Sequence, residues 1–448
     1  MNQYVSNTIN RIKNKYPYEP EFIQTVEEVL TSLSPVIDMH PEYEKSDLLG
    51  RMTEPERMIT FRVSWVDDNG QTHVNTGYRC QFNGAIGPYK GGIRFAPNVY
   101  SGIIKFLGFE QTFKNSLTTL PMGGGKGGAD FDTKGRSDGE IMRFCQAFIT
   151  ELYRHMGPDV DVPAGDIGVG AREVGYMYGQ YRRIRGAFEN GAFTGKGLSF
   201  GGSLIRPEAT GYGAVYYLCE VLNHRNDSIK GKTVALSGYG NVTWGVASKL
   251  AELGAKAVTI SGHDGYVYDP DGICGEEKLN YLLEMRKSNR HRVKDYADKF
   301  DCKFYENKKP WEIKADIAMP CATQNEVDIE DAKAIIANGI KYYMEVSNMP
   351  STKEALNYLM NHDVIVGPAK AVNAGGVAVS GLEMCQNSMR YSWTAQEVDE
   401  KLKRIMRDIH NNSVLAAEKY NLGYNLVAGA NIAGFEKIAE AMTAQGII

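Results

Sequence analysis

The chain has 448 residues, a formal net charge of −4 and a pI of about 6.1. This charge gives no general electrostatic reason to bind nucleic acid or an anionic membrane, and the length favours two domains over one. No apolar run approaches the ~18 residues that span a bilayer, and the N-terminus lacks the apolar segment of a secretory signal. We therefore expect a cytoplasmic protein.

The cysteines and histidines give no support for a metal site or a disulfide framework. The seven cysteines are scattered and contain no CxxC pair, and the eight histidines form no HExxH motif. This usage is typical of reduced thiols in a cytoplasm. We expect no metal ligands.

The first third of the chain predicts strands followed by a helix. Residues 58–82 contain two β-rich runs joined by an Asp-Asn-Gly turn, which predicts a hairpin. Residues 137–157 repeat apolar side chains on one helical face, and Ser137 with Glu140 forms a possible capping box. Gly157-Pro158 is the expected end of this helix.

Between these elements, residues 121–130 read PMGGGKGGAD, so that Lys126 lies among five glycines. A Walker A loop needs GxxxxGK followed by Ser or Thr, but Leu120 takes the first glycine position and Gly127 follows the lysine. We therefore expect a chemical role. A desolvated lysine in a cationic site loses its proton more easily and can act as a general acid or base.

Two further lysines occur in unusual settings, Lys90 in GPYKGGIRF and Lys114 in FLGFEQTFKNSL. Either one alone is more often an ordinary surface lysine, but the glycines beside Lys90 and Lys126 permit close approach to a ligand. Lys90 and Lys114 would supply the positive charge near Lys126. On a helix, Gln111 shares a face with Lys114.

A carboxylate partner for Lys126 is predicted in the stretch DVPAGDIGVG. Asp166 lies there between small residues on an expected loop, where it either stabilises a turn or moves a proton near Lys126.

After a glycine-rich passage at residues 193–213, which we interpret as a hinge or domain boundary, the pattern changes. Buried strands are predicted in KTVALSGYG, AKAVTISG, ADIAMPCA, KYYMEVSN and DVIVGPA, and they alternate with helices. This βαβ series predicts a parallel sheet. A long helix follows, with Thr394 and Glu397 at its start.

The segment GYGNVTWG carries a dinucleotide signal. Gly238 can make a tight turn, and Gly240 can let the backbone approach a pyrophosphate at a helix N-terminus. Thr243 takes the third fingerprint position in place of Gly or Ala, so a plain strand–helix turn is the alternative.

Cofactor preference stays open at this level. The second strand ends in Ser261-Gly262-His263-Asp264, and Asp264 lies slightly far along for the ribose hydroxyl. His263, or a basic stretch, could meet a 2′-phosphate, although a solvated helix face is the favoured interpretation of that stretch. Its members are Arg286, Lys287, Arg290, His291 and Arg292.

Several of these motifs, in this order, resemble those of the hexameric bacterial glutamate dehydrogenases in the Glu/Leu/Phe/Val dehydrogenase family. The match extends over nearly the whole chain. The segments that carry it are NGAIGPYKGGIRF, LTTLPMGGGKGGADFD, DVPAGDIGVGAREVGYM, FGGSLIRPEATGYG, MPCATQNEV, NAGGVAVSGLEM and NLVAGANIAGFEKIAEAM.

The resemblance implies a two-domain α/β fold. A substrate-binding and oligomerisation domain would cover residues 1–200 and be completed by a C-terminal helix at 425–448. A Rossmann-like NAD(P)-binding domain would cover 201–424. The implied assembly is a homohexamer, and closure about the glycine-rich hinge would exclude water from the reaction.

The resemblance also implies the reaction, in which L-glutamate, NAD(P)+ and water give 2-oxoglutarate, ammonium and NAD(P)H. In the implied site, Lys126 activates water and Asp166 moves a proton to and from the amino nitrogen. Lys90 with Ser380 binds the γ-carboxylate, Lys114 binds the α-carboxylate, and Gln111 and the backbone of Gly165 seat the substrate. Thr210 and Asn241 contact the nicotinamide half of the cofactor, and Gly238 and Gly240 contact the pyrophosphate. Tyr239 and Gly262 favour NAD, whereas His263 is compatible with NADP.

Two other functions are weighed against this one. A dehydrogenase for branched-chain or aromatic amino acids would use the same scaffold, but an apolar residue at position 90 would suit it better than Lys90. A non-catalytic nucleotide-binding regulator would be expected to lack the catalytic pair, whereas Lys126 and Asp166 are both present.

Overall fold

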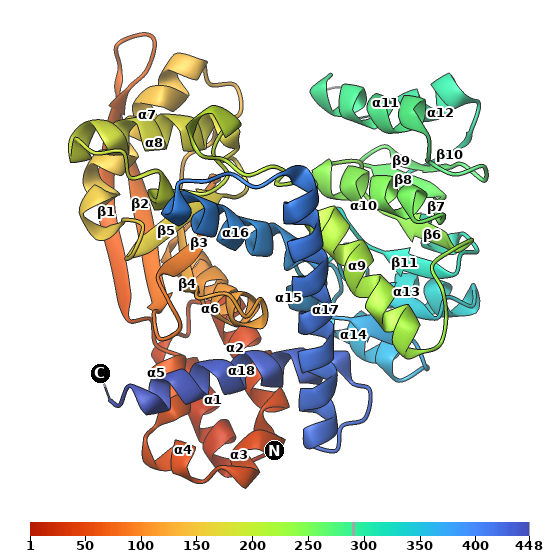
Figure 1. Cartoon of the computed structure of the whole chain (residues 1–448), viewed down its shortest axis with the longest axis horizontal. Coiled ribbons are helices and arrows are strands. Elements are labelled where there is room, and N and C mark those ends of the chain that lie inside the picture. The colour runs from red at the N-terminus through yellow and green to blue at the C-terminus, as the bar shows by residue number, and fades with distance from the viewer. Residues whose placement is uncertain (289–291, 448) are drawn as a thin grey trace. The chain divides into compact units, whose positions relative to one another are not determined.

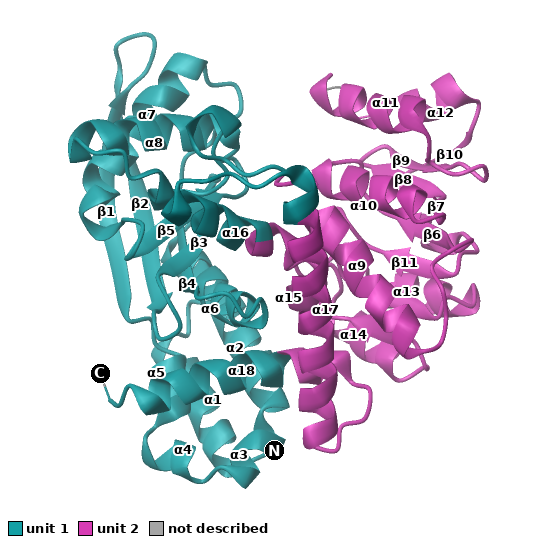
Figure 2. Ribbon diagram, viewed as in Figure 1, with its two compact units in different colours: residues 1–204, 379–398, 431–448 teal, residues 205–378, 399–430 magenta. Residues whose placement is uncertain are grey.

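The computed structural model describes residues 1–288 and 292–447, which form two compact units. Unit 1 contains residues 1–204, 379–398 and 431–448, and unit 2 contains residues 205–378 and 399–430 (Figure 2). The change after Leu204 falls in the glycine-rich passage. The predicted domain limits remain a prediction, and the units differ from them mainly in residues 379–398, which pack with unit 1.

Unit 1 is built on a five-stranded mixed sheet in the order β1-β2-β4-β3-β5 (Figure 1). The strands are β1 (Arg57–Val66), β2 (Thr72–Asn83), β3 (Tyr89–Phe95), β4 (Gly123–Ala129) and β5 (Asp161–Gly165). β1–β2 and β2–β4 are antiparallel, whereas β3 runs parallel to both β4 and β5. The predicted hairpin at residues 58–82 is confirmed as β1 and β2.

The N-terminal helices of unit 1 are α1 (Gln3–Lys15), α2 (Pro20–Ser32), α3 (Ser34–Met39), α4 (Glu42–Lys45) and α5 (Leu48–Met52). Three more helices pack on the sheet or on one another: α6 (Ser101–Leu117), α7 (Asp138–Leu152) and α8 (Ala171–Arg185). The capping box of Ser137 and Glu140 is confirmed at the start of α7. The helix ends five residues before the predicted position, because a 3₁₀ turn at Tyr153–His155 follows Leu152.

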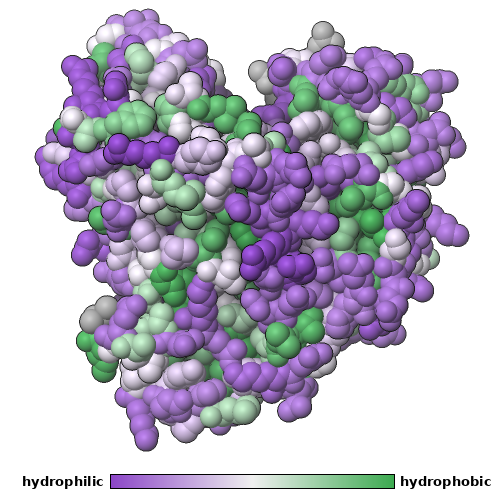
Figure 3. Space-filling model, viewed as in Figure 1, coloured by the Kyte–Doolittle hydropathy of each residue, from purple (hydrophilic) through white to green (hydrophobic). Residues whose placement is uncertain are grey.

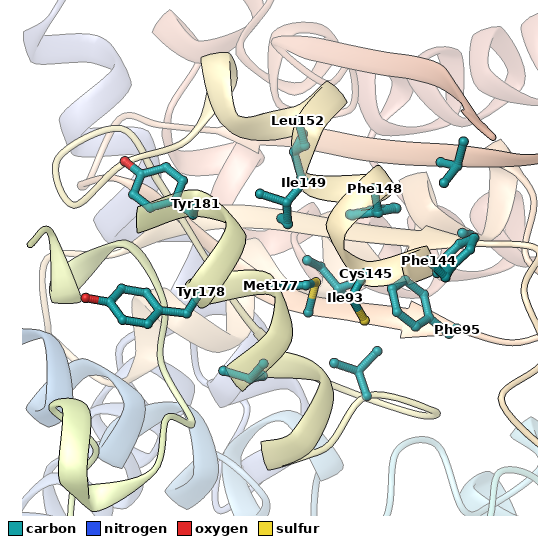
Figure 4. Packing of buried hydrophobic residues seen from close by; sticks show 14 of the residues in the cluster. Ile93, Phe95, Phe144, Cys145, Phe148, Ile149, Leu152, Met177, Tyr178 and Tyr181 are labelled. Atoms are coloured by element: carbon teal, nitrogen blue, oxygen red, sulfur yellow. The ribbon is translucent and has the colours of Figure 1, made fainter. Parts of the chain in front are cut away.

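One hydrophobic core of unit 1 lies between the sheet and the pair α7 and α8. Figure 4 shows Phe144 and Phe148 of α7 close to Phe95 of β3, with Met177 of α8 beside them. The rings of Phe95 and Phe144 meet edge to face with centroids 5.1 Å apart. Burying this aromatic cluster fixes β3, which carries two of the site residues described below.

Unit 2 contains the predicted parallel sheet, in the order β13-β12-β11-β6-β7. Its strands are β6 (Thr233–Leu236), β7 (Lys256–Ala257), β11 (Ile317–Met319), β12 (Tyr342–Met344) and β13 (Ile365–Gly367). The helices contained in unit 2 are α9 (Ala209–His224), α10 (Asn241–Glu252), α11 (Glu276–Lys287), α12 (Lys294–Phe300), α13 (Ile329–Ala337), α14 (Lys353–Met360) and α15 (Ala369–Val372). Strand, helix and parallel strand alternate as a Rossmann-like fold requires.

One predicted strand of unit 2 is wrong in its extent. Residues 255–262 were expected to form a single strand, but they divide at Val258 into β7 and β8 (Thr259–Gly262). The Val258 amide donates to Val234 of the parallel sheet, whereas its carbonyl accepts from Asp269. The chain thus leaves one sheet for a second, antiparallel one, which β8 forms with β9 (Gly265–Tyr268) and β10 (Lys303–Glu306).

Three C-terminal helices cross the limits of the units: α16 (Gly375–Met389), α17 (Ala395–Lys419) and α18 (Leu426–Ala444). The predicted cap of α17 is confirmed, because Glu397 accepts from Thr394 at 2.7 Å and the Thr394 hydroxyl accepts from the Glu397 amide.

Candidate active site

A lysine–aspartate pair with a buried lysine lies at the sheet of unit 1. Lys126 is on β4, opposite Cys80 of β2, and its side chain is only 6% exposed. Asp166 directly follows β5, and its Oδ1 lies 3.2 Å from Lys126 Nζ. Its other oxygen, Oδ2, accepts from Arg94 Nε at 2.7 Å. The structure therefore brings together the two predicted catalytic residues and adds an arginine.

Burial and charge set the protonation states of this pair. Burial lowers the pKa of Lys126 below the ordinary lysine value, an effect that Asp166 opposes and Arg94 and Arg79 reinforce. Burial alone would raise the pKa of Asp166, but the charges of Lys126 and Arg94 outweigh it and lower the pKa to about 2. Near neutral pH the aspartate is thus ionised beside a lysine that gives up its proton more readily than usual.

That Lys90 and Lys114 supply positive charge near Lys126 stays a prediction, and the structure adds two cations to it. Arg94 and Arg79 both lower the pKa of Lys126. Arg79 is fully buried and donates Nε to Asp161 at 2.9 Å and Nη1 to the Gly91 carbonyl at 3.0 Å. It ties β2 to β3 and β5, and arginine is favoured there because its planar fork satisfies several acceptors at once.

The interpretation of the glycines around Lys126 needs correction. They were expected to form a tight backbone against ligands, but they make up β4, an interior strand of the sheet. A Cβ on Gly124 would lie 1.9 Å from the Thr112 hydroxyl of α6, and one on Gly123 would lie 2.4 Å from the Asn83 carbonyl. Glycine is needed here because a helix and neighbouring strands approach too closely for any side chain.

The predicted substrate residues occupy adjoining elements of unit 1. Lys90 is buried on β3 opposite Gly124, and Gly165 ends β5 opposite Ile93. Gln111 and Lys114 share α6, as predicted, and Gln111 donates to Asn115 at 2.6 Å.

Ser380, the remaining predicted substrate residue, is buried on α16, in the part that belongs to unit 1. Its neighbour Gly381 packs against Leu120 and Met122, just before β4. Ser380 therefore lies on a helix that contacts the residues just before β4, the strand that carries Lys126.

A cavity of about 730 Å³ in unit 2 is lined in part by the turn between β6 and α10. Gly238 has φ +74°, and a Cβ there would lie 2.9 Å from the Thr243 hydroxyl. Gly240 is the N-cap of α10, and its missing Cβ would meet open space. Thr243 donates its hydroxyl to the Ser237 carbonyl at 3.0 Å, so this residue closes the turn from within.

The cavity is lined by Gly238, Tyr239, Gly240, Ser261, Gly262, His263, Arg286, Lys287, Lys308, Lys309, Pro310, Ala322, Thr323 and Glu326. A glycine turn opening on a helix N-terminus, with cationic side chains around it, suits the pyrophosphate of a dinucleotide. The donor set of this cavity thus fits such a cofactor.

Two other residues considered for the cofactor site, Asp264 and Arg286, have partners within the protein. Asp264 accepts from the amides of Val293 and Lys294, both at 3.1 Å, so its carboxylate caps α12. Arg286 donates to Asn241 Oδ1, and the exposed side chains of Arg286 and Lys287 line the cavity, so this end of the solvated helix face borders the predicted cofactor site. Arg290 and His291, from the same predicted stretch, lie outside the described residues.

Thr210, near the start of α9, is not among the residues that line the cavity. A Cβ on Gly376 would lie 2.6 Å from its hydroxyl.

Family models match two segments of the chain. Residues 201–446 match the Glutamate/Leucine/Phenylalanine/Valine dehydrogenase model, and residues 55–183 match the Glu/Leu/Phe/Val dehydrogenase dimerisation domain. The chain belongs to the Glu/Leu/Phe/Val dehydrogenase family. It is therefore related to oxidoreductases that act on amino acids.

Individual members of the Glu/Leu/Phe/Val dehydrogenase family are similar over the whole chain. The NAD-specific glutamate dehydrogenase of Clostridium symbiosum is 69% identical over 448 residues, covering 100% of both chains. The NADP-specific glutamate dehydrogenase of Haemophilus influenzae is 55% identical and covers 98% of both. A solved glutamate dehydrogenase has a TM-score of 0.99 at 69% identity, again with complete coverage of both chains.

Sequence reasoning missed two residues that shape the site in this family member. Arg94 contacts Asp166, and Asn115 donates to the carbonyls of Lys90 at 2.9 Å and Gly123 at 2.6 Å. The spacing of Arg94, four residues after Lys90 on a strand, could have revealed it, because residues i and i+4 share a face. No local pattern marks Asn115, because the two carbonyls that it binds belong to other elements of the fold.

On the face shown in Figure 3, hydrophilic side chains predominate and apolar ones are interspersed. In the part of the chain that the structure describes, no helix is both long and apolar enough to cross a membrane.

Proposed function

We propose that this protein is a glutamate dehydrogenase, which converts L-glutamate, NAD+ and water to 2-oxoglutarate, ammonium, NADH and a proton. The observation that carries the proposal is the Lys126–Asp166 pair, at 3.2 Å, whose buried lysine lies in the same sheet as the buried Lys90. Names of relatives at 69% and 55% identity support the same reaction.

The substrate is a dicarboxylate, and the site offers lysines for both of its ends. Lys90 on β3, with Ser380 on α16, binds the γ-carboxylate, and Lys114 on α6 binds the α-carboxylate. Gln111 and the Gly165 backbone seat the molecule. Charge-assisted hydrogen bonds of this kind are about twice as strong as neutral ones, and they fix the direction of the substrate.

Lys126 and Asp166 carry the proton transfers. Once hydride has left Cα and the substrate is an iminium, Lys126 takes a proton from the water that attacks Cα, which is possible because burial lowers the pKa of Lys126. Asp166 exchanges a proton with the amino nitrogen. When bound, NAD supplies the acceptor for the hydride that leaves Cα.

In unit 2, Gly238 and Gly240 hold the pyrophosphate, and Thr210 and Asn241 contact the nicotinamide half. We favour NAD over NADP because of Tyr239 and Gly262 and because the 69% identical relative is named NAD-specific. The basic residues that line the cavity make NADP the cofactor to test beside it.

The proposed assembly is a cytoplasmic homohexamer. The match of residues 55–183 to a dimerisation domain supports self-association of the chain. Light scattering of the purified protein tests this state, and a monomeric mass would contradict it.

The first experiment is an initial-rate assay with glutamate, leucine and phenylalanine, each with NAD+ and with NADP+. Turnover of glutamate with NAD+ dominant is expected. Activity confined to leucine or phenylalanine would show that the γ-carboxylate role of Lys90 is wrong. Inactivity with all six combinations would favour a non-catalytic nucleotide-binding protein.

The variant Lys90→Leu sharpens this assay. It should reduce kcat/KM for glutamate by about 100-fold or more, on the scale of a lost charged hydrogen bond, and affect norvaline far less. Lys134→Leu, an exposed lysine in the same unit, is the control. Equal losses for glutamate and norvaline would contradict the assignment.

A further inference from the structure

We propose that Arg94 is a positioning residue that fixes Asp166 against Lys126 and places a permanent positive charge beside both. This inference rests on the proposed function, because it concerns the proton transfers of the same site. It assigns to Arg94 the control of where and when those protons move.

The contacts of Arg94 divide the two oxygens of Asp166. Arg94 Nε donates to Oδ2 at 2.7 Å, which leaves Oδ1 toward Lys126 Nζ at 3.2 Å. The guanidinium is planar and the Arg94 side chain is only 15% exposed, so the direction of this bond is held by packing. A carboxylate fixed at one oxygen exchanges protons through the other.

The surrounding backbone keeps this geometry. Arg94 pairs with Gly128 of β4, and a Cβ on Gly128 would lie 2.6 Å from the Arg94 carbonyl. A Cβ on Gly92, two residues before Arg94, would lie 2.9 Å from Cβ of Asp166. The close approach of β3 to both partners therefore depends on glycines, which shows that the arrangement is built into the sheet.

Arg79 and Arg94 both lower the pKa of Lys126, but they pair with different carboxylates. The charge of Arg79 is balanced by the buried Asp161, with which it forms two hydrogen bonds. The carboxylate of Arg94 is Asp166 itself. Arg94 is thus the cation whose removal changes both members of the Lys126–Asp166 pair.

Substitution of Arg94 alone leaves unchanged the other charged groups on the elements next to Lys126. They are His73 and Arg79 on β2, Lys90 on β3, Lys105, Glu110 and Lys114 on α6, and Asp161 on β5.

Loss of the Arg94 charge has a defined sign. A positive neighbour disfavours protonated Lys126, so a neutral residue at position 94 lets Lys126 keep its proton to higher pH. The acid-side limb of kcat for glutamate oxidation, where Lys126 must lose its proton, then moves to higher pH. A change of about one pH unit is expected for a charge at this range.

The test compares Arg94→Gln, which loses the charge, with Arg94→Lys, which keeps the charge but loses the planar donor. We expect kcat to fall about tenfold in both variants. The acid-side limb should rise by about one pH unit only in Arg94→Gln. Arg172→Gln, which removes a partly exposed arginine that pairs with Glu173 and Asp138, is the matched control.

A second measurement needs neither substrate nor turnover. The rate at which acetic anhydride labels Lys126, followed by peptide mass spectrometry across pH, reports the fraction of unprotonated lysine. Its midpoint should move up by about one pH unit in Arg94→Gln and stay in Arg94→Lys.

The outcomes separate the two proposals. The role of Arg94 is overturned if Arg94→Gln leaves unchanged both the acid-side limb of kcat and the labelling midpoint of Lys126. It is also overturned if Arg172→Gln shifts them to the same extent. Absence of glutamate oxidation in the unmodified enzyme would overturn the proposed function, whatever the labelling shows. If Arg94→Gln does not fold, an unchanged midpoint in Arg94→Lys together with full kcat would still contradict the role of its planar donor.

Discussion

Two glycine-rich segments of this molecule look alike in sequence and differ in what glycine does. In β4, Gly123 and Gly124 lie in a regular strand, and the space a side chain would need is filled by α6 and by backbone. In the turn after β6, Gly238 has φ +74° and the missing Cβ of Gly240 would meet open space. Glycine permits close packing inside the sheet in the first segment, and a bend and an open surface in the second.

The difference shows where the chemistry lies in each segment. In β4 the proposed catalytic group is the side chain of Lys126, and the glycines allow the strand to pack against its neighbours. In the turn, the backbone of the glycines is itself the proposed contact with the cofactor. Substitutions at the two places should therefore affect different measurements.

The largest effect is expected for Gly124→Ala. The new Cβ would lie 1.9 Å from the Thr112 hydroxyl and 2.6 Å from its Cα, so α6 must move away from the sheet. We expect the free energy of unfolding to fall by about 3 kcal/mol or more. Urea denaturation followed by fluorescence measures it, and a loss below about 1 kcal/mol would show that the packing argument is wrong.

The next effect concerns Lys126 between those glycines. Lys126→Ala and Asp166→Asn should each reduce kcat by at least ~100-fold, the usual scale for a general acid or base, while NAD binding is retained. Steady-state kinetics and a cofactor titration measure the two properties. Near-normal turnover in either variant would refute its catalytic role.

The smallest effect on folding is expected for Gly240→Ala, because no atom lies within 4 Å of the new Cβ. The free energy of unfolding should change by less than about 0.5 kcal/mol. The Kd for NAD should rise about tenfold, since the methyl group takes space next to the pyrophosphate.

Gly238→Ala is the companion variant at this turn. In addition to weaker NAD binding, this variant should have a free energy of unfolding lower by about 1–2 kcal/mol, because alanine disfavours a left-handed φ. Unchanged NAD affinity in both variants would contradict the proposal that the glycine backbone of this turn contacts the cofactor.

The sequence predicted most of the fold because its signals were local. The hairpin of β1 and β2, the cap of α7 and the parallel strands of unit 2 each follow from turn residues, capping residues and apolar runs. The division of residues 255–262 at Val258 was missed because it depends on pairing with Asp269, outside that run.

For the candidate site, the residue types were predicted more completely than their neighbours. Lys126 and Asp166 are adjacent, as expected, and the structure adds Arg94 and Arg79, which the sequence did not suggest, as cations beside Lys126. Which charges meet in a sheet is decided by strand order, and β3 lies between β4 and β5 although it precedes both in the chain. No local pattern fixes that order.

The interleaving of the two units has a consequence for synthesis on the ribosome. The sheet of unit 1 is complete in sequence before residue 204, yet unit 1 also includes residues 379–398 and 431–448. At about 5–20 residues per second, these pieces emerge on the order of ten seconds or more after the sheet. During that interval the nascent sheet lacks Ser380, so the proposed substrate site can be assembled only after residue 380 has been added.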